Sequence, residues 1–331
     1  MTEVALSGAH TVSGIEQSRL KALHRFMLAE STFRIATLSA AVLVLVLLGA
    51  VIVSLIIGSI PAFRAFGFGF LTSESWNPVT EKFGALAPVY GTVVTSFIAM
   101  LIGIPVSFGI AIFLTELCPY SLRRPIGIAI ELLAGIPSII YGIWGLFVFA
   151  PFLQATVQPF LITVFGPIPG LNAIFAGPPY GIGVFTAGLI LAIMVLPFIT
   201  AITRDVFLTV PPVLKEAAYG VGCTTWEVVR KVVLPFTRVG VIGGVMLGLG
   251  RALGETMAVT FVIGNAHRIS ASVLAPGTTI SAAIANEFTE AVGDIYTSSL
   301  VAIALILFVI TFIVLAAARL MLMRIERRLG T

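Results

Sequence analysis

The sequence predicts an all-α integral membrane protein with six membrane-spanning helices. The chain of 331 residues is 58% hydrophobic and only 10% charged, and its mean hydropathy is +1.10. Soluble domains carry about 25% charged residues, so this chain has too few polar side chains to cover a water-exposed surface. Its apolar runs continue for about 20 residues, the length of a spanning helix, whereas the strands of membrane barrels alternate over about ten.

Six apolar segments are long enough to cross a hydrocarbon core of about 30 Å at about 1.5 Å per residue. We expect spans at about residues 36–60, 91–115, 126–150, 181–203, 239–263 and 297–320. The segment 151–180 is also apolar and uncharged, but six prolines divide it. We therefore expect it to be an outer-side loop, and the sequence leaves open whether it is re-entrant.

The distribution of Lys and Arg indicates the orientation. With both termini in the cytoplasm, fifteen of the 19 cations fall in cytoplasmic segments, and only Arg64, Lys82 and Arg268 fall outside. Cytoplasmic loops of membrane proteins carry such an excess. The net charge of +4 therefore indicates topology rather than nucleic-acid binding.

This topology divides the chain into a cytoplasmic tail of residues 1–34, a permease domain of residues 35–325 and a C-terminal tail of residues 326–331. In the first tail, Leu20, Leu23 and Met27 occur at helical spacing among basic residues. That pattern is typical of a helix at the membrane interface, and a plain solvated tail remains the alternative.

The polar segment 204–238 separates the fourth and fifth expected spans. We expect a short helix over 213–219, a turn at Gly220 and Gly222, and a second helix over 224–233 with Thr224 or Thr225 as N-cap. Leu234-Pro235 is expected to end this second helix. Any cytoplasmic loop of this length can be amphipathic, so the pattern alone does not assign a role.

The spacing of particular residues in this segment is more specific. It resembles the cytoplasmic coupling loop, or EAA loop, of ABC importer permeases, on which ATPase subunits act. The residues that carry the resemblance, and that it implies for ATPase coupling, are Glu216, Ala217, Ala218, Gly222, Leu234 and Pro235.

One face of the fifth expected span combines small and charged residues. Gly240, Gly244, Gly248, Arg251 and Glu255 fall within roughly 80° of one another on a continuous helix. The glycines predict close packing against another helix. We expect Arg251 and Glu255, one turn apart, to form an ion pair in a substrate pathway or gate, and a purely structural pair is the alternative. The planar guanidinium of Arg251 suits an oxyanion.

Several further sequence segments indicate a more specific family. Residues 250–259, 131–138, 141–145 and 83–92 resemble PstC-type permeases of phosphate ABC importers. The resemblance implies type I importer architecture in the bacterial plasma membrane, and it assigns function to Arg251 and Glu255. It also implies a PstA-type second permease, two copies of a PstB-type ATPase and an extracytoplasmic PstS-type phosphate-binding protein.

The expected function is transport of inorganic phosphate by a pore-forming subunit that is not an enzyme. The sequence contains no GxxxxGK[ST] loop for ATP, no metal-ligand spacing and no catalytic constellation, and it predicts no cofactor. A permease for sulfate or molybdate is one alternative, because Arg251 does not distinguish these oxyanions. An ATP-independent secondary transporter or channel is the other, since Pro137 and Pro197 can break spans.

Overall fold

The computed structural model describes residues 2–329, with side chains for Met27 and residues 30–324. The chain forms two compact units, Met1–Ile57 and Gly58–Thr331. The described part of the first unit belongs to one long helix, α1 (Thr2–Phe66). Its described Leu and Val side chains are exposed, apart from the half-buried Leu55. Met27 is exposed, whereas the side chains of Leu20 and Leu23, on which the interfacial-helix hypothesis depends, lie outside the described residues.

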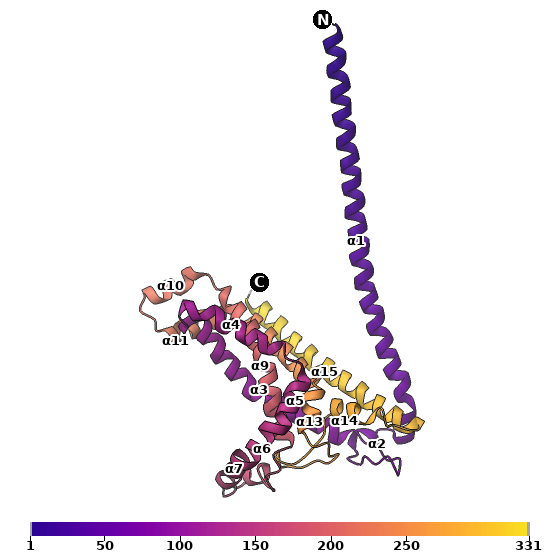
Figure 1. Ribbon diagram of the computed structural model, residues 1–331, viewed down its shortest axis with the longest axis vertical. Coiled ribbons are helices and arrows are strands. Elements are labelled where there is room, and N and C mark those ends of the chain that lie inside the picture. The colour runs from indigo at the N-terminus through magenta and orange to yellow at the C-terminus, as the bar shows by residue number, and fades with distance from the viewer. Residues whose placement is uncertain (1, 330–331) are drawn as a thin grey trace. The chain divides into compact units, whose positions relative to one another are not determined.

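The second unit is helical and is shown in Figure 1. Its elements are α2 (Gly69–Thr72), α3 (Leu86–Ile112), η1 (Phe113–Leu117), α4 (Tyr120–Ala134), α5 (Ser138–Trp144), η2 (Gly145–Phe149), α6 (Ala150–Phe152), η3 (Leu153–Val157), α7 (Gln158–Phe165), α8 (Leu171–Ile174), α9 (Val184–Leu208), α10 (Pro212–Gly220), α11 (Thr225–Val228), η4 (Val229–Val233), α12 (Leu234–Leu253), α13 (Met257–Val262), α14 (Ile280–Glu287) and α15 (Asp294–Leu329). The η segments are π-helical turns within or at the end of longer helices.

Six helical segments among the described residues are long and apolar enough to cross a membrane, which confirms the predicted number. They are Glu30–Phe66, Leu86–Leu117, Ser138–Phe165, Val184–Leu208, Thr225–Leu253 and Asp294–Arg324.

Helix α9 is the central helix of the second unit. In its most apolar window 61% of the residues are buried, against 33% or less in each other candidate span. It packs against α3, α4, α12 and α13, and Ile190, Leu191, Val195 and Ile199 lie in the largest core cluster. A helix that is apolar on all sides, as α9 is, belongs in the interior.

The glycines of α12 form a close seam with α9. A Cβ added at Gly240, Gly244 or Gly248 would lie 2.7, 2.8 and 2.6 Å from side chains of Val206, Ile202 and Ile199, respectively. These distances are shorter than van der Waals contact, so only glycine allows the two helices to approach this closely. The seam fixes the position of α12 against the central helix.

The third span differs from the sequence-based expectation. Residues 126–134 belong to the separate helix α4, which ends before Pro137, and the candidate span is Ser138–Phe165. The expected span 126–150 and the loop 151–180 are therefore wrong in their boundaries. Pro151 and Pro159 do not break the helix because each follows a π-helical turn. A π turn shifts the hydrogen-bonding register, so a residue without an N–H is accommodated.

A polar and aromatic cluster connects the segments at the end of the bundle that carries α14. Trp76 Nε1 and the Tyr296 hydroxyl each donate to Glu287 Oε2 at 2.6 Å, and His267 Nε2 lies 2.6 Å from Glu287 Oε1. The Trp76 and His267 rings stack with centroids 4.9 Å apart. Burial raises the pKa of Glu287, but the hydrogen bonds from His267, Tyr296 and Trp76 outweigh burial and hold that pKa below its ordinary value.

The seam predicts a position-specific effect of alanine. Gly244→Ala places a methyl group against Ile202, and we expect it to destabilise the protein by about 1–3 kcal/mol through overpacking. Gly243→Ala is the matched control on the same helix, since a Cβ there meets nothing within 4 Å. Thermal melting of the purified protein in detergent measures both. Equal melting temperatures for the two variants would contradict the seam.

The Glu287 cluster predicts an acid-sensitive contribution to stability. Because folding lowers the pKa of Glu287, its contribution is fully present above the unfolded-state pKa and is lost as the pH falls through the folded-state pKa. We expect Glu287→Gln to cost about 1–3 kcal/mol at neutral pH and less in acid. Melting curves over a pH series test this, and a cost independent of pH would show that the carboxylate charge is irrelevant.

Candidate functional site

The segment between α9 and α12 forms a compact helical loop, which we call the coupling loop and define as residues 209–235. The expected first helix is α10, which extends one residue beyond each end of 213–219. The turn contains Gly222 at φ +90°, a conformation that favours glycine. Thr224 caps α11 in a capping box with Glu227, in agreement with one of the two predicted N-caps.

Leu234-Pro235 does not end the second helix. The helix continues from Thr225 to Leu253, through α11, η4 and α12. The π-helical turn at Val229–Val233 immediately precedes Pro235 and lets the helix pass through it, as at Pro151 and Pro159. A single continuous helix therefore connects the second half of the coupling loop to the fifth span.

The base of the coupling loop is fixed to three spans. Val228 and Val233 are buried in a cluster with Ala111 of α3, Phe207 of α9 and Val241 of α12. Lys215 Nζ also lies 2.6 Å from Glu116 Oε1, and both side chains are largely buried. Separating a buried ion pair is strongly unfavourable because it leaves each charge uncompensated. This contact therefore holds α10 against η1 at the end of α3.

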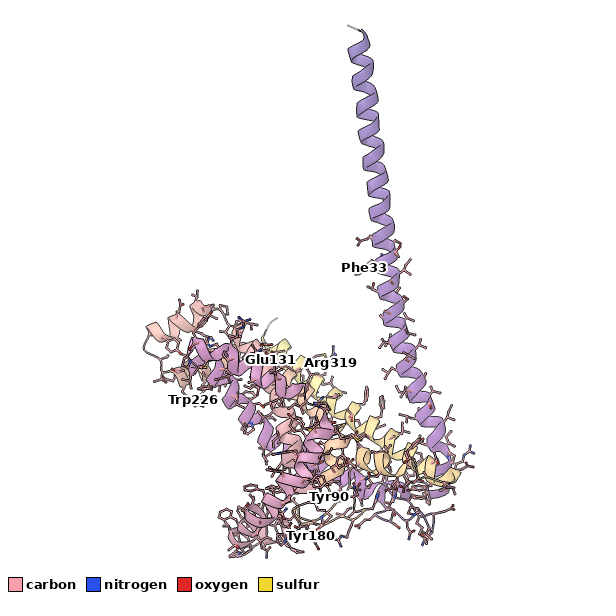
Figure 2. The ribbon with its side chains drawn as sticks, in the orientation of Figure 1. Phe33, Tyr90, Glu131, Tyr180, Trp226 and Arg319 are labelled. Carbon is pink, nitrogen blue, oxygen red and sulfur yellow. The ribbon has the colours of Figure 1, made fainter. Side chains whose placement is uncertain are left out.

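The predicted coupling residues divide between the two faces of the loop. Three of them, Glu216, Ala217 and Pro235, are exposed. Ala218 and Leu234 instead pack against the buried cluster. Sequence reasoning did not single out the most exposed apolar residues of this loop, which include Val213, Val221 and Trp226 at 70, 82 and 61% exposure. Figure 2 shows Trp226 and Glu131 at one end of the bundle and Tyr180 at the opposite end.

The coupling loop therefore exposes both apolar side chains and a carboxylate, which are common components of protein-docking surfaces. Aromatic residues such as Trp are enriched at protein–protein interfaces. This surface, formed by α10, the turn and α11, is well suited to a protein partner.

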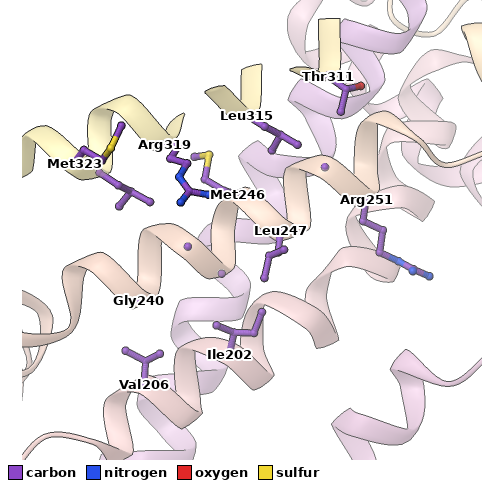
Figure 3. Close-up of a pocket in the computed structure, with 14 residues that line it drawn as sticks. Ile202, Val206, Gly240, Met246, Leu247, Arg251, Thr311, Leu315, Arg319 and Met323 are labelled. Carbon is purple, nitrogen blue, oxygen red and sulfur yellow. The ribbon is translucent and has the colours of Figure 1, made fainter. Parts of the chain in front are cut away.

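Arg251 lies near the end of α12, beside the seam. Its guanidinium carbon lies 4.2 Å from the ring centroid of Phe198 on α9, a cation–π contact. Its Nε is buried and has no hydrogen-bond partner. Arg251 and Arg319 both line a pocket of about 880 Å³ between α12 and α15, whose other lining residues are mostly apolar. Figure 3 shows the pocket and the Arg251 side chain at one end of it.

The expected ion pair between Arg251 and Glu255 does not form among the described residues. Helix α12 ends at Leu253, and the chain turns at Gly254 before α13 begins at Met257. Glu255 is therefore not on the expected helical face, and its Oε1 lies 3.5 Å from the Ala258 N–H near the start of α13. The stripe of Gly240, Gly244, Gly248 and Arg251 does lie against α9, through Val206, Ile202, Ile199 and Phe198.

Comparisons with known proteins agree with this architecture. Residues 107–327 match the family described as "Binding-protein-dependent transport system inner membrane component". The chain is 72% identical to the phosphate transport system permease protein PstC of Mesorhizobium japonicum, over 96% of this chain and 97% of the relative. The PstC protein of Pasteurella multocida is 59% identical, over 91 and 94%. A probable PstC protein of Methanocaldococcus jannaschii is 38% identical, over 85 and 90%.

Solved structures show the same fold at low sequence identity. A bacterial alginate ABC transporter in complex with an alginate-bound periplasmic protein matches 86% of this chain and 94% of its own at a TM-score of 0.55 and 18% identity. The MetNI methionine ABC transporter, in an inward-facing conformation, matches 72 and 95% at a TM-score of 0.52 and 17% identity.

Six candidate spans, the fold of ABC importer permeases and the family match agree with one another. The protein is a multi-pass plasma-membrane subunit, and the non-catalytic permease role belongs to its family. The chain belongs to the family of inner membrane components of binding-protein-dependent transport systems and, within it, to the PstC-type permeases.

Proposed function

We propose that this chain is the membrane-spanning subunit of an ABC importer for inorganic phosphate. The observation that carries the proposal is its 72% identity, over nearly its full length, to a phosphate transport system permease. Arg251 supports it chemically. Its Nε has no hydrogen-bond partner, and it shares a mostly apolar pocket with a second arginine, Arg319, so the site has unused donors for an oxyanion.

The subunits implied by this function are a PstA-type permease, a pair of PstB-type ATPases and a PstS-type phosphate-binding protein. The distribution of charge supports cytoplasmic termini and a cytoplasmic coupling loop. Arg123, Arg124, Lys215, Arg230 and Lys231 belong to elements at the end of the bundle that carries α10 and α11 (Figure 1). That excess is typical of the cytoplasmic side.

The opposite end of the bundle is the proposed docking face for the binding protein. Glu287 at this end is used internally, as the acceptor in the Trp76 cluster. Glu290, Val292 and Asp294 are exposed and remain available to a partner.

The proposed mechanism follows from the continuous helix. ATP binding closes the ATPase dimer, and the movement is applied to the exposed face of α10 and α11. The buried cluster and the Lys215–Glu116 contact transmit the movement to α3 and α9, and η4 transmits it to α12. Since Arg251 lies on α12 against α9, a movement of this seam changes the exposure of its guanidinium.

A permease for sulfate or molybdate remains the second candidate, because one guanidinium binds each oxyanion similarly. The relatives named for phosphate favour phosphate. Uptake of labelled phosphate in cells that depend on this chain, with excess sulfate or molybdate as competitor, separates the candidates. Strong competition by either anion would contradict phosphate selectivity.

The coupling loop predicts a loss of ATPase stimulation when its exposed carboxylate is reversed. We expect Glu216→Lys to lower ATPase stimulation of the reconstituted transporter at least about tenfold, because reversing a charge in a docking face places it against the partner's complementary charge. Membrane insertion and melting temperature should be unchanged, because Glu216 is exposed. The control is Glu30→Lys, which reverses an exposed carboxylate outside the loop. Full stimulation of the Glu216 variant would contradict the docking role.

The pocket predicts that Arg251 acts on transport rather than on capture. We expect Arg251→Gln to reduce phosphate uptake at least about tenfold while phosphate binding by the binding protein stays normal, and Arg251→Lys to retain part of the uptake because it keeps the charge without the planar fork. Arg319→Gln, in the same pocket, is the control for charge alone. If both Gln variants lose uptake equally, the effect reflects the pocket's total charge and not Arg251.

A further inference from the structure

A second pocket, separate from the one that Arg251 lines, lies at the end of the bundle that carries the coupling loop. Its volume is about 550 Å³, within the range of small-molecule sites. The π-helical turn η1, the first turns of α4 and the last turns of α9 supply its walls. Three arginines line it, Arg123, Arg124 and Arg204, together with the hydroxyl side chains of Thr115, Tyr120 and Ser121.

The charges in this pocket are not balanced. Arg204 is paired, with Nη2 2.7 Å from both Glu131 Oε1 and Asp205 Oδ1. The ion pairs of the described residues include neither Arg123 nor Arg124. Arg123 and Arg124 are adjacent in the sequence and line one cavity, and three guanidinium groups against the two carboxylates on Arg204 leave this group with a net charge of +1.

Arg123 also has an unused donor. Its Nη2 donates to the Cys118 carbonyl at 3.4 Å, but its Nε is buried and has no hydrogen-bond partner. Buried donors are normally paired, and leaving one unpaired destabilises the structure. A rotation of the Arg123 side chain toward the pocket would let this donor meet an acceptor held there.

The start of α4 adds to the positive potential. This helix is 15 residues long, and its N-cap is Pro119, with no side-chain cap on the first turn. The N-terminal end of a helix carries a partial positive charge and favours anions. Since Tyr120, Ser121 and Arg123 of the first turns all line the pocket, the helix end and the guanidinium groups act on the same volume.

We propose that this pocket binds a phosphate-type oxyanion, held by Arg123 and Arg124 at the start of α4. Arginine forks match the oxygen geometry of a phosphoryl group, and the hydroxyls of Ser121 and Tyr120 can donate to its remaining oxygens. The group is either inorganic phosphate or the headgroup phosphate of an anionic lipid. Neither source requires the transport site at Arg251.

An occupant of this pocket would connect α4 to the base of the coupling loop. Arg204 and Leu208 of the wall belong to the last turns of α9, directly before the loop begins. Glu116 of η1, one residue from the lining Thr115, holds α10 through Lys215. Anion binding is therefore expected to stiffen the elements that carry the loop.

The test is a binding measurement on the full chain in lipid nanodiscs, with two arms. In the first arm, nanodiscs of neutral phosphatidylcholine are titrated with inorganic phosphate at constant ionic strength, and the melting temperature is recorded. In the second, phosphatidylglycerol is added to the nanodiscs and retained lipid is counted by native mass spectrometry. We expect either a phosphate-dependent rise in melting temperature in the first arm or retained phosphatidylglycerol in the second, and the responding arm identifies the source. We expect the Arg123→Gln/Arg124→Gln variant to bind at least about tenfold more weakly in that arm.

Two further variants keep the test decisive. Arg324→Gln removes an exposed arginine outside both pockets and should respond like the wild type. Arg123→Lys/Arg124→Lys preserves both charges and loses the forks, so it should bind more weakly, and it replaces the Gln variant if that variant fails to fold. The assignment is overturned if neither arm responds, or if the response is the same in the Gln or Lys double variant, since binding would then lie elsewhere.

Discussion

The close seam between α9 and α12 is the contact on which the rest of this structure depends. Three glycines allow α12 to lie against the most buried helix of the bundle, and the same helix continues without a break into the coupling loop. Force applied to the loop is therefore applied to the seam. Larger side chains in the seam would move α12 away from α9. That movement would break the cation–π contact between Arg251 and Phe198, which positions Arg251.

π-Helical turns allow helices of this protein to continue through prolines, which would otherwise break or kink them. Pro151, Pro159 and Pro235 each lie two residues beyond the end of a π turn, within a helix that continues. The π turn shifts the hydrogen-bonding register, so the helix continues although proline has no N–H to donate. In the fifth span, the π turn keeps the coupling loop and the membrane-spanning helix continuous. A continuous helix is needed to transmit movement from the loop to the span.

Features that depend on the average hydropathy or periodicity of a long segment could be predicted from the sequence. Features that depend on the local backbone conformation at one or two residues could not. Hydropathy over windows of about 20 residues gave six spans, and spacing on a helical circumference placed the glycines and Arg251 on one face. It did not predict the continuation through Pro235, because a π turn has no composition signal. It also missed the break after Leu253, so Glu255 was assigned to a helical face that it does not occupy. Trp226 was overlooked because exposure is a tertiary property, although a Trp in a polar loop is itself a signal.

The account rests on the coupling loop facing the cytoplasm, where an ATPase can bind it. Two exposed valines at opposite ends of the bundle, Val221 at the loop turn and Val292 before α15, allow a direct measurement. Each is replaced by Cys in a background with Cys118 and Cys223 changed to Ser, and intact cells are treated with a membrane-impermeant maleimide. We predict that Val292→Cys is labelled from outside and that Val221→Cys is labelled only after the membrane is opened. Labelling of Val221→Cys in intact cells would contradict the coupling role.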